Sequence, residues 1–354
     1  MAPTVRVFAS AALSVGILGG ISSAQASQLI FPYIVGSATV TTILTVANTT
    51  PPGHPGGGDA ALHYTYMYKT GATAVMNDAL CSRTPTTILS SATNDVQSFD
   101  VSGHFGSATR GVLFNDPSNN NNWDSGAQDW ASLSGLEPVR AYGVIHNNND
   151  DTGATFPAPY LYGEAFVFEF GSGAAWGYQA LEDKGAGGTV DLAPFALGNR
   201  LPFTLGVPTG RFTFMPTTEF VTRFFVTPVT TEMANVNAQS RMRVFPWVED
   251  PDVAGYDRDA NPIPGFVPQD VTCIGAVDIE SMLSSSAATA LQHGGWAYLA
   301  TIPPDSDLPG TVPTVTANVI KLEYNKGATF NGEPIGGVFN NAYQMRGIRG
   351  MYPE

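Results

Sequence analysis

Residues 39–46 read TVTTILTV, a short run that is rich in β-branched residues and half apolar. Val, Ile and Thr favour strands because their branched side chains pack well on a pleated surface. Similar runs of about five to ten residues recur along the chain, bounded by Gly, Pro, Asn or Asp. They lie at 62–68, 164–170, 220–226, 241–245 and 315–324. The pattern predicts an all-β protein.

The composition agrees with many short strands joined by turns. The chain has 354 residues, of which 43% are hydrophobic and 13% are charged, and it contains 38 Gly and 26 Pro. This hydrophobic share excludes a disordered polyelectrolyte. The net charge is −14 at pH 7, with only 16 Lys and Arg. Because nucleic-acid binding needs clustered Lys and Arg, we expect no nucleic-acid partner.

The first 26 residues have the three parts of a secretory signal peptide. Arg6 provides a positive charge, residues 7–22 are apolar and uncharged, and residues 24–26 read AQA, a small-x-small cleavage site. Glycines interrupt the apolar stretch, which is shorter than a membrane span requires. No other segment is long and apolar enough to cross a bilayer. We therefore expect a secreted protein, in the periplasm, at the cell surface or outside the cell, with no transmembrane segment in the mature chain.

The mature length suggests two domains. We expect the signal peptide at 1–26, a first β-sandwich module at 27–190, a Pro- and Gly-rich connector at 191–217 and a second module at 218–354. The fold class that we expect is two tandem, related antiparallel β-sandwich modules, Ig-like or jelly-roll-like, with one short helix.

A weak internal repeat supports related modules. The strand-like run at 39–49 is similar to 219–227, and the run at 62–69 is similar to 241–248. Further along, 111–114 corresponds to 295–299. The alternative is coincidence, because strands rich in Thr and Val look alike in any two sandwiches.

The one helix is expected after Asp278, which has the chemistry of an N-cap. The apolar residues between Ile279 and Leu291 follow a period near 3.6, and His293-Gly294-Gly295 would end the helix.

Cys81 and Cys273 are the only cysteines. In an exported chain, an oxidising compartment favours a disulfide between them. If the repeat is real, the two occupy matching positions, and the bridge would join the modules. The alternative is two unpaired, buried thiols.

Asp257, Asp259 and Asn261 have the D-x-D-x-N spacing that begins a calcium loop. Pro262 stands where the EF-hand pattern has its turn glycine, so the resemblance is partial. We predict a weak structural Ca²⁺ site here and no other cofactor. The alternative is a solvated turn, because Asp and Asn are good turn formers.

Trp123 and Trp130 lie in a loop rich in amide side chains, and they are the candidate ligand-binding residues for a glycan. Core packing or loop anchoring is the alternative for both.

No catalytic pattern stands out. The sequence has no G-x-S-x-G or H-E-x-x-H motif. Glu164 and Glu169 share a strand but are five residues apart, so in a regular strand they point to opposite faces. They cannot flank one glycosidic bond unless a bulge lies between them.

We expect an exported, non-catalytic structural β protein of the cell surface or extracellular space. Its partners would be further copies of itself or components of the cell envelope. The alternative is a carbohydrate- or surface-binding adhesin, and a secreted hydrolase on a β scaffold is the third reading.

Overall fold

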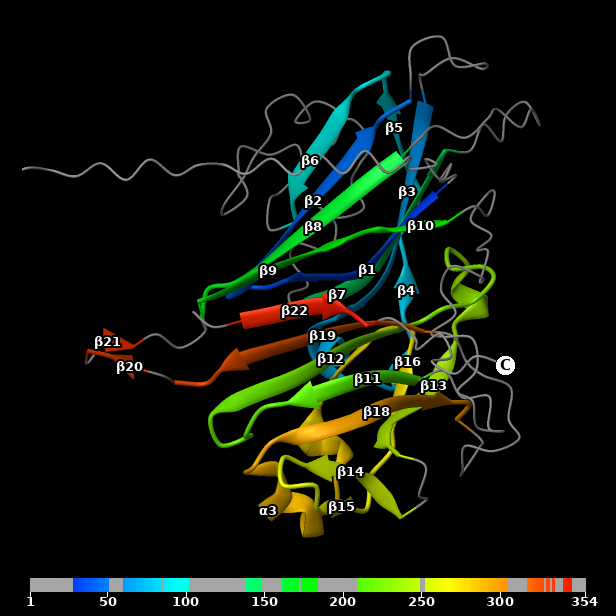
Figure 1. Cartoon of the computed structure of the whole chain (residues 1–354). Coiled ribbons are helices and arrows are strands. Elements are labelled where there is room, and N and C mark those ends of the chain that lie inside the picture. The colour runs from blue at the N-terminus through cyan, green and yellow to red at the C-terminus, as the bar shows by residue number, and fades with distance from the viewer. Residues whose placement is uncertain are drawn as a thin grey trace, which may run out of the picture.

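The computed structural model shows an almost entirely β-stranded chain built from stacked antiparallel sheets (Figure 1). All strand pairings in the described part of the chain are antiparallel. The structure describes residues 28–50, 60–84, 86–101, 138–147, 161–171, 173–183, 209–248, 252–304, 317–327, 329–331, 333–334 and 340–345. The predicted signal peptide and residues 191–208 of the predicted connector lie outside these ranges.

The first module is a sandwich of two sheets, which we name 1A and 1B. Side chains from both sheets, such as Tyr64 of 1A and Val167 of 1B, belong to one buried core. Sheet 1A has the order β10 (Leu181–Asp183), β1 (Gln28–Gly36), β7 (Val139–Asn147), β3 (Ala60–Thr70) and β4 (Ser82–Arg83), with β5 (Thr87–Ser91) also on β3. Sheet 1B has the order β6 (Val96–Asp100), β2 (Val40–Asn48), β8 (Leu161–Glu169) and β9 (Ala174–Gln179).

The second module is also a sandwich, of sheets that we name 2A and 2B. Met242 of 2A and Phe224 of 2B meet in its core. Sheet 2A has the order β15 (Pro262–Pro264), β14 (Val253–Asp257), β18 (Gly295–Ile302), β13 (Arg241–Trp247) and β16 (Gln269–Thr272), with β11 (Thr209–Phe214) also on β18. Sheet 2B has the order β17 (Gly275–Asp278), β12 (Phe220–Pro228), β19 (Ala317–Asn325) and β22 (Asn340–Gln344). A separate hairpin consists of β20 (Thr329–Phe330) and β21 (Glu333–Pro334).

The strands of the two modules follow the same order in their sheets. In 1B and 2B the orders are β6-β2-β8-β9 and β17-β12-β19-β22. In 1A and 2A the shared parts are β1-β7-β3-β5 and β11-β18-β13-β16. This common topology agrees with the expectation of related modules. Strand β11 falls within the predicted connector, yet it pairs with β18 along its whole length.

The repeat differs in detail from the sequence expectation. The strand that corresponds to β18 is β7, and residues 111–114, which were matched with 295–299, lie outside the described residues. The cysteines do not occupy matching positions either. Cys81 directly precedes β4, whereas Cys273 lies between β16 and β17.

Sheet 2B is covered on both faces. Phe224 and Val319 point into the core shared with sheet 2A. Phe225 and Ile320, their neighbours in sequence, point the other way and belong to the core of the first module. Strand β19 is therefore buried at its first seven positions, as expected for a strand with both faces covered.

The expected helix is shorter than its apolar pattern indicated. The segment consists of two 3₁₀ turns, η4 (Ile279–Met282) and η5 (Ser285–Ala287), and the short helix α3 (Ala288–Leu291). The carboxylate of Asp278 binds Arg223 instead of capping the helix, and Leu283 has extended backbone angles. Gly294 has a φ of +73° and ends the segment as expected. None of the helices described is long and apolar enough to cross a membrane.

Candidate functional site

The most elaborate polar site in the described structure is the joint between the modules. Cys81 and Cys273 form a disulfide across it, with their Cα atoms 6.1 Å apart, which confirms the predicted pairing. Both cysteines are buried. Gln239 of the second module holds the backbone of Cys81: its Oε1 accepts from Cys81 N at 2.7 Å, and its Nε2 donates to Cys81 O at 2.8 Å. The covalent link is thus flanked by a two-point hydrogen bond.

Lys69, at the end of β3, lies buried at the same joint, with 1% of its surface exposed. Its ammonium group donates to three backbone carbonyl oxygens: Met76 at 3.0 Å, Asn77 at 3.1 Å and Ile274 at 2.7 Å. The third acceptor belongs to the second module and follows Cys273 directly. Burial, and to a smaller extent Arg140, lower the pKa of Lys69 to about 7. The three carbonyls compensate the ammonium group for part of its lost hydration.

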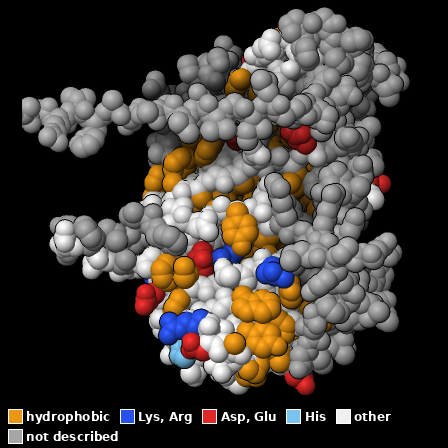
Figure 2. Space-filling model, viewed as in Figure 1, with side chains coloured by type: hydrophobic (Ala, Val, Ile, Leu, Met, Phe, Trp, Pro, Cys, Tyr) orange, Lys and Arg blue, Asp and Glu red, His pale blue; other side chains and the backbone are white. Residues whose placement is uncertain are grey.

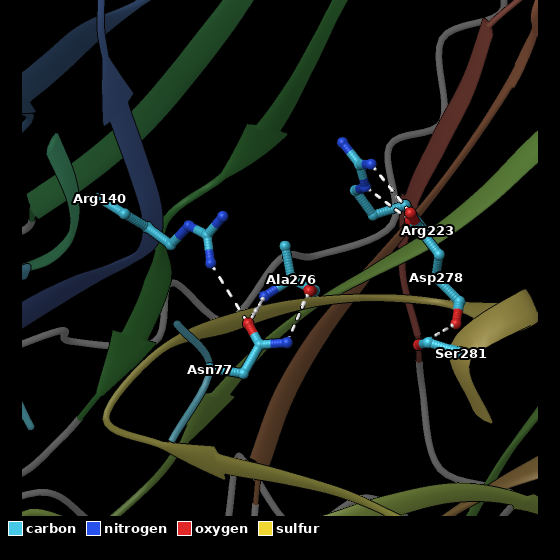
Figure 3. A network of polar contacts seen from close by, with 6 residues as sticks. All are labelled: Asn77, Arg140, Arg223, Ala276, Asp278 and Ser281. Carbon is cyan, nitrogen blue, oxygen red and sulfur yellow. Dashed lines mark hydrogen bonds and ion pairs between the residues drawn. The ribbon is translucent and has the colours of Figure 1, made fainter. Parts of the chain in front are cut away.

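Asn77 extends the joint by acting as a partner for the edge of strand β17 (Figure 3). Its Oδ1 accepts from Ala276 N and its Nδ2 donates to Ala276 O, both at 2.9 Å. The backbone O of Asn77 also accepts from Thr272 N at 2.8 Å. Arg140 of β7 donates to the same Oδ1 at 3.3 Å. An amide side chain can thus satisfy both polar groups of a strand residue that would otherwise lack a partner.

A salt bridge lies further along the edge of sheet 2B that is shown in Figure 3. Arg223 of β12 binds Asp278 of β17 in a bidentate manner, at 2.7 and 3.0 Å. Ser281 Oγ donates to the backbone O of Asp278 at 2.7 Å. The ion pair raises the pKa of Arg223 above its usual range. These contacts hold β17 against β12 where Asn77 reaches the sheet.

Aromatic rings and hydroxyl groups complete the joint. The ring of Phe225 stacks on Tyr33 with centroids 4.0 Å apart and on Trp176 with centroids 5.1 Å apart. Tyr142 OH donates to Met233 O at 2.6 Å, and Thr227 Oγ1 donates to Pro32 O at 2.6 Å. Because hydrogen bonds, a shared apolar core and a covalent bond all cross the joint, the arrangement fixes the two modules in one orientation.

A second cluster surrounds the predicted calcium residues. His293 Nδ1 lies 3.9 Å from Asp257 Oδ2 and 3.8 Å from Asp259 Oδ2, and the three side chains could hold a metal ion. The structure therefore brings Asp257 and Asp259 together, but with His293 as the third member. Calcium prefers oxygen ligands, whereas an imidazole suits zinc and other transition metals.

Asn261, the third predicted calcium ligand, has a different role. Its Nδ2 donates to Asp257 Oδ2 at 3.0 Å, and its backbone N donates to Asp257 Oδ1 at 2.8 Å. Asp259 N donates to the same Oδ1 at 2.9 Å. These hydrogen bonds, those of Asn261 first, lower the pKa of Asp257. The carboxylate of Asp257, which is 5% exposed, therefore closes the β14–β15 turn.

Other predicted site residues are less informative. Trp123 and Trp130 lie outside the described residues. Glu164 lies on the outer face of β8, beside the exposed Phe166, whereas Glu169 lies near enough to Tyr33 of the joint to raise the pKa of that phenol, after the larger effect of burial. This placement agrees with the expectation that the two carboxylates occupy opposite faces.

The sequence reasoning missed Lys69, Asn77 and Gln239. Lys69 carried no signal of burial, because in the alternating run 62–68 it falls on the same side as His63 and Thr65, opposite the bulky residues. Asn77 and Gln239 look like ordinary loop residues, and their role depends on contacts with distant segments.

The fold and the joint define a protein of two topologically equivalent β-sandwich modules locked together by a disulfide. No protein-family model matches the chain, and no curated protein shows significant similarity to its sequence.

Proposed function

We propose that this chain is an exported, non-catalytic structural protein of the cell surface or extracellular space, able to associate with further copies of itself. The observation that carries the proposal is the joint. A disulfide, a buried lysine and a shared apolar core make one rigid body of two modules, which suits a component that must keep a fixed shape outside the cell. A disulfide is also typical of proteins that fold in oxidising compartments.

The chemistry of the described residues supports a structural role. The strongly perturbed lysine, Lys69, is buried and donates to backbone carbonyls, so it is not accessible to a substrate. The bidentate Arg223–Asp278 pair and the Asp257 carboxylate are engaged in bonds that hold strands and turns. A perturbed ionisable group is a candidate for catalysis when it lies in a cleft, and none of these groups lines the groove formed by the described residues of β8, β9 and β22.

The proposal is tested with the secreted chain, purified with its disulfide intact. We expect mass spectrometry to place its first residue at Ser27, and light scattering to show a mass that rises with protein concentration. Electron microscopy would then reveal regular assemblies. A strict monomer at high concentration, or a chain that retains residues 1–26 inside the cell, would contradict the proposal.

The adhesin alternative and the calcium site at Asp257, Asp259 and Asn261 stay predictions. Their candidate residues are either outside the described structure, as for Trp123 and Trp130, or already engaged in a turn. A glycan-binding role for the Trp loop would appear as binding that is lost in Trp123→Ala.

A further inference from the structure

A groove opens on the outer face of sheet 1B, where the first module meets the edge of the second. It has a volume of about 400 Å³ and is lined by Glu164, Phe166, Gly177, Tyr178, Gln179 and Gln344. Five of these residues come from β8 and β9, and Gln344 comes from β22 of the other module, which lies beside β9 (Figure 1). The surface in Figure 2 is hollowed in this region, with hydrophobic side chains inside the hollow. The volume falls in the range of small-molecule sites.

The floor of the groove is an aromatic ring that is held flat and open. Phe166 is 41% exposed although it lies in the middle of a strand. Gly177 is its partner on β9, and a Cβ there would come within 3.0 Å of the Phe166 ring and 3.1 Å of Ala165 O. Because Gly177 has no side chain, the Phe166 ring can lie close to the β9 backbone while the residue stays 41% exposed. The face of an aromatic ring packs against flat apolar groups.

The polar side chains that line the groove with Phe166 are held in place by hydrogen bonds with neighbouring residues. Gln179 is the cross-strand partner of Glu164. Its Nε2 donates to Tyr162 OH at 3.0 Å, and this hydroxyl donates to Glu164 Oε1. Gln344 Nε2 donates to Gln179 O at 2.9 Å, which fixes the side chain from the second module. A carboxylate and two amides thus border the ring in positions set before any ligand arrives, which reduces the cost of ordering them on binding.

This combination favours one class of ligand. A pyranose ring has an apolar face of C–H groups, which can stack on Phe166, and an edge of hydroxyls, which can pair with carboxylate and amide groups. The carboxylate of Glu164 and the net charge of −14 disfavour anionic ligands. We propose that this groove binds a neutral saccharide, with Phe166 as the stacking platform and Glu164, Gln179 and Gln344 as the hydroxyl partners. The proposal does not depend on the structural role inferred above.

The test begins with the oxidised, secreted chain on an array of neutral glycans, followed by calorimetric titration of the glycan that binds best. Phe166→Ala is expected to weaken binding by roughly tenfold or more, and Glu164→Gln by a smaller factor. Phe170→Ala is the matched control, because Phe170 is an exposed Phe directly after the same strand and does not line the groove. It is expected to bind like the unaltered chain, and all three variants are compared for unchanged circular dichroism.

Three outcomes would overturn the assignment. The first is an array on which no neutral glycan binds. The second is a glycan whose affinity is the same for Phe166→Ala and the unaltered chain, including one lost only in Trp123→Ala. The third is a groove that binds a lysine-rich peptide, sensitive to Glu164→Gln, but no saccharide. None of these results bears on self-association, so the two proposals fail separately.

Discussion

Sheets 1B and 2B have the same strand order but different surroundings. In β8 of sheet 1B, buried and accessible residues alternate, and Phe166 faces outward. In β19 of sheet 2B, the equivalent strand, every residue from Ala317 to Glu323 is buried. The difference arises because the first module covers the outer face of 2B, whereas the outer face of 1B carries the groove. The same strand topology thus gives a sheet that is buried at the joint in the second module and a sheet with an accessible outer face in the first module.

The comparison also shows that the residues that stabilise the joint differ from the residues that line the groove. The residues that join the modules are buried or half-buried, and Lys69, Asn77 and Gln239 each make several hydrogen bonds there. The residues of the groove keep polar atoms and an aromatic face accessible. Four substitutions or conditions can test this division, and they differ in the size of the expected effect.

The largest effect is expected from opening the outer face of sheet 2B. Phe225→Ala removes a ring that is 3% exposed and that stacks on both Tyr33 and Trp176. We expect a loss of about 3–5 kcal/mol in the free energy of unfolding, measured by chemical denaturation. Phe166→Ala, on the outer face of sheet 1B, is expected to cost about 1 kcal/mol or less. Equal losses for the two variants would show that the faces are not buried differently.

The disulfide is the next strongest element of the joint. It closes a sequence separation of 192 residues, so the Cys81→Ser/Cys273→Ser double variant should lose about 2–5 kcal/mol. Thermal unfolding with and without reductant supplies the measurement. Reductant should lower the Tm of the unaltered chain and leave that of the double variant unchanged. A Tm of the unaltered chain that reductant does not lower would mean that the bridge contributes nothing to the joint.

Asn77→Ala tests the hydrogen bonds at the edge of β17. The variant leaves the N–H and C=O of Ala276 without the partner they have now, and we expect a loss of about 1–3 kcal/mol. Asn237→Ala removes an exposed amide in η3 (Val236–Ala238) and should change stability by less than about 0.5 kcal/mol. Hydrogen exchange at Ala276 should become faster in the first variant only. If the amide of Ala276 exchanged as slowly in Asn77→Ala as in the unaltered chain, the contact between Asn77 and the edge of β17 would be excluded.

Lys69 gives the joint a pH dependence. The unfolded lysine keeps its proton up to about pH 10.5, whereas the folded one loses it near pH 7. Between these values the unfolded chain binds more protons, so stability rises with pH, by at most about 1.4 kcal/mol per unit. We expect this slope between pH 7 and 9 in the unaltered chain and its loss in Lys69→Met. Identical slopes in both would show that Lys69 stays protonated in the folded chain.

The strand pattern, the disulfide and the existence of two halves were readable from the sequence because each depends on local signals. Alternating β-branched and aromatic runs predict strands wherever they occur, and the two cysteines of this chain have only each other as partners within it. The helix was overestimated for two reasons. Asp278, which was expected to cap it, binds Arg223 instead, and the run of serines at 284–286 favours turns.

The roles of Lys69, Asn77, Gln239 and Phe166 were decided by the tertiary structure. The first three depend on segments far away in the chain: Ile274 for Lys69, Ala276 for Asn77 and Cys81 for Gln239. The exposure of Phe166 depends on Gly177 of the neighbouring strand. The sequence determines that a strand has two faces, but which face is covered depends on what packs against it. The sequence therefore determined a two-part β protein with one bridge, and only the packing of the modules decided which surfaces form the joint and which remain open.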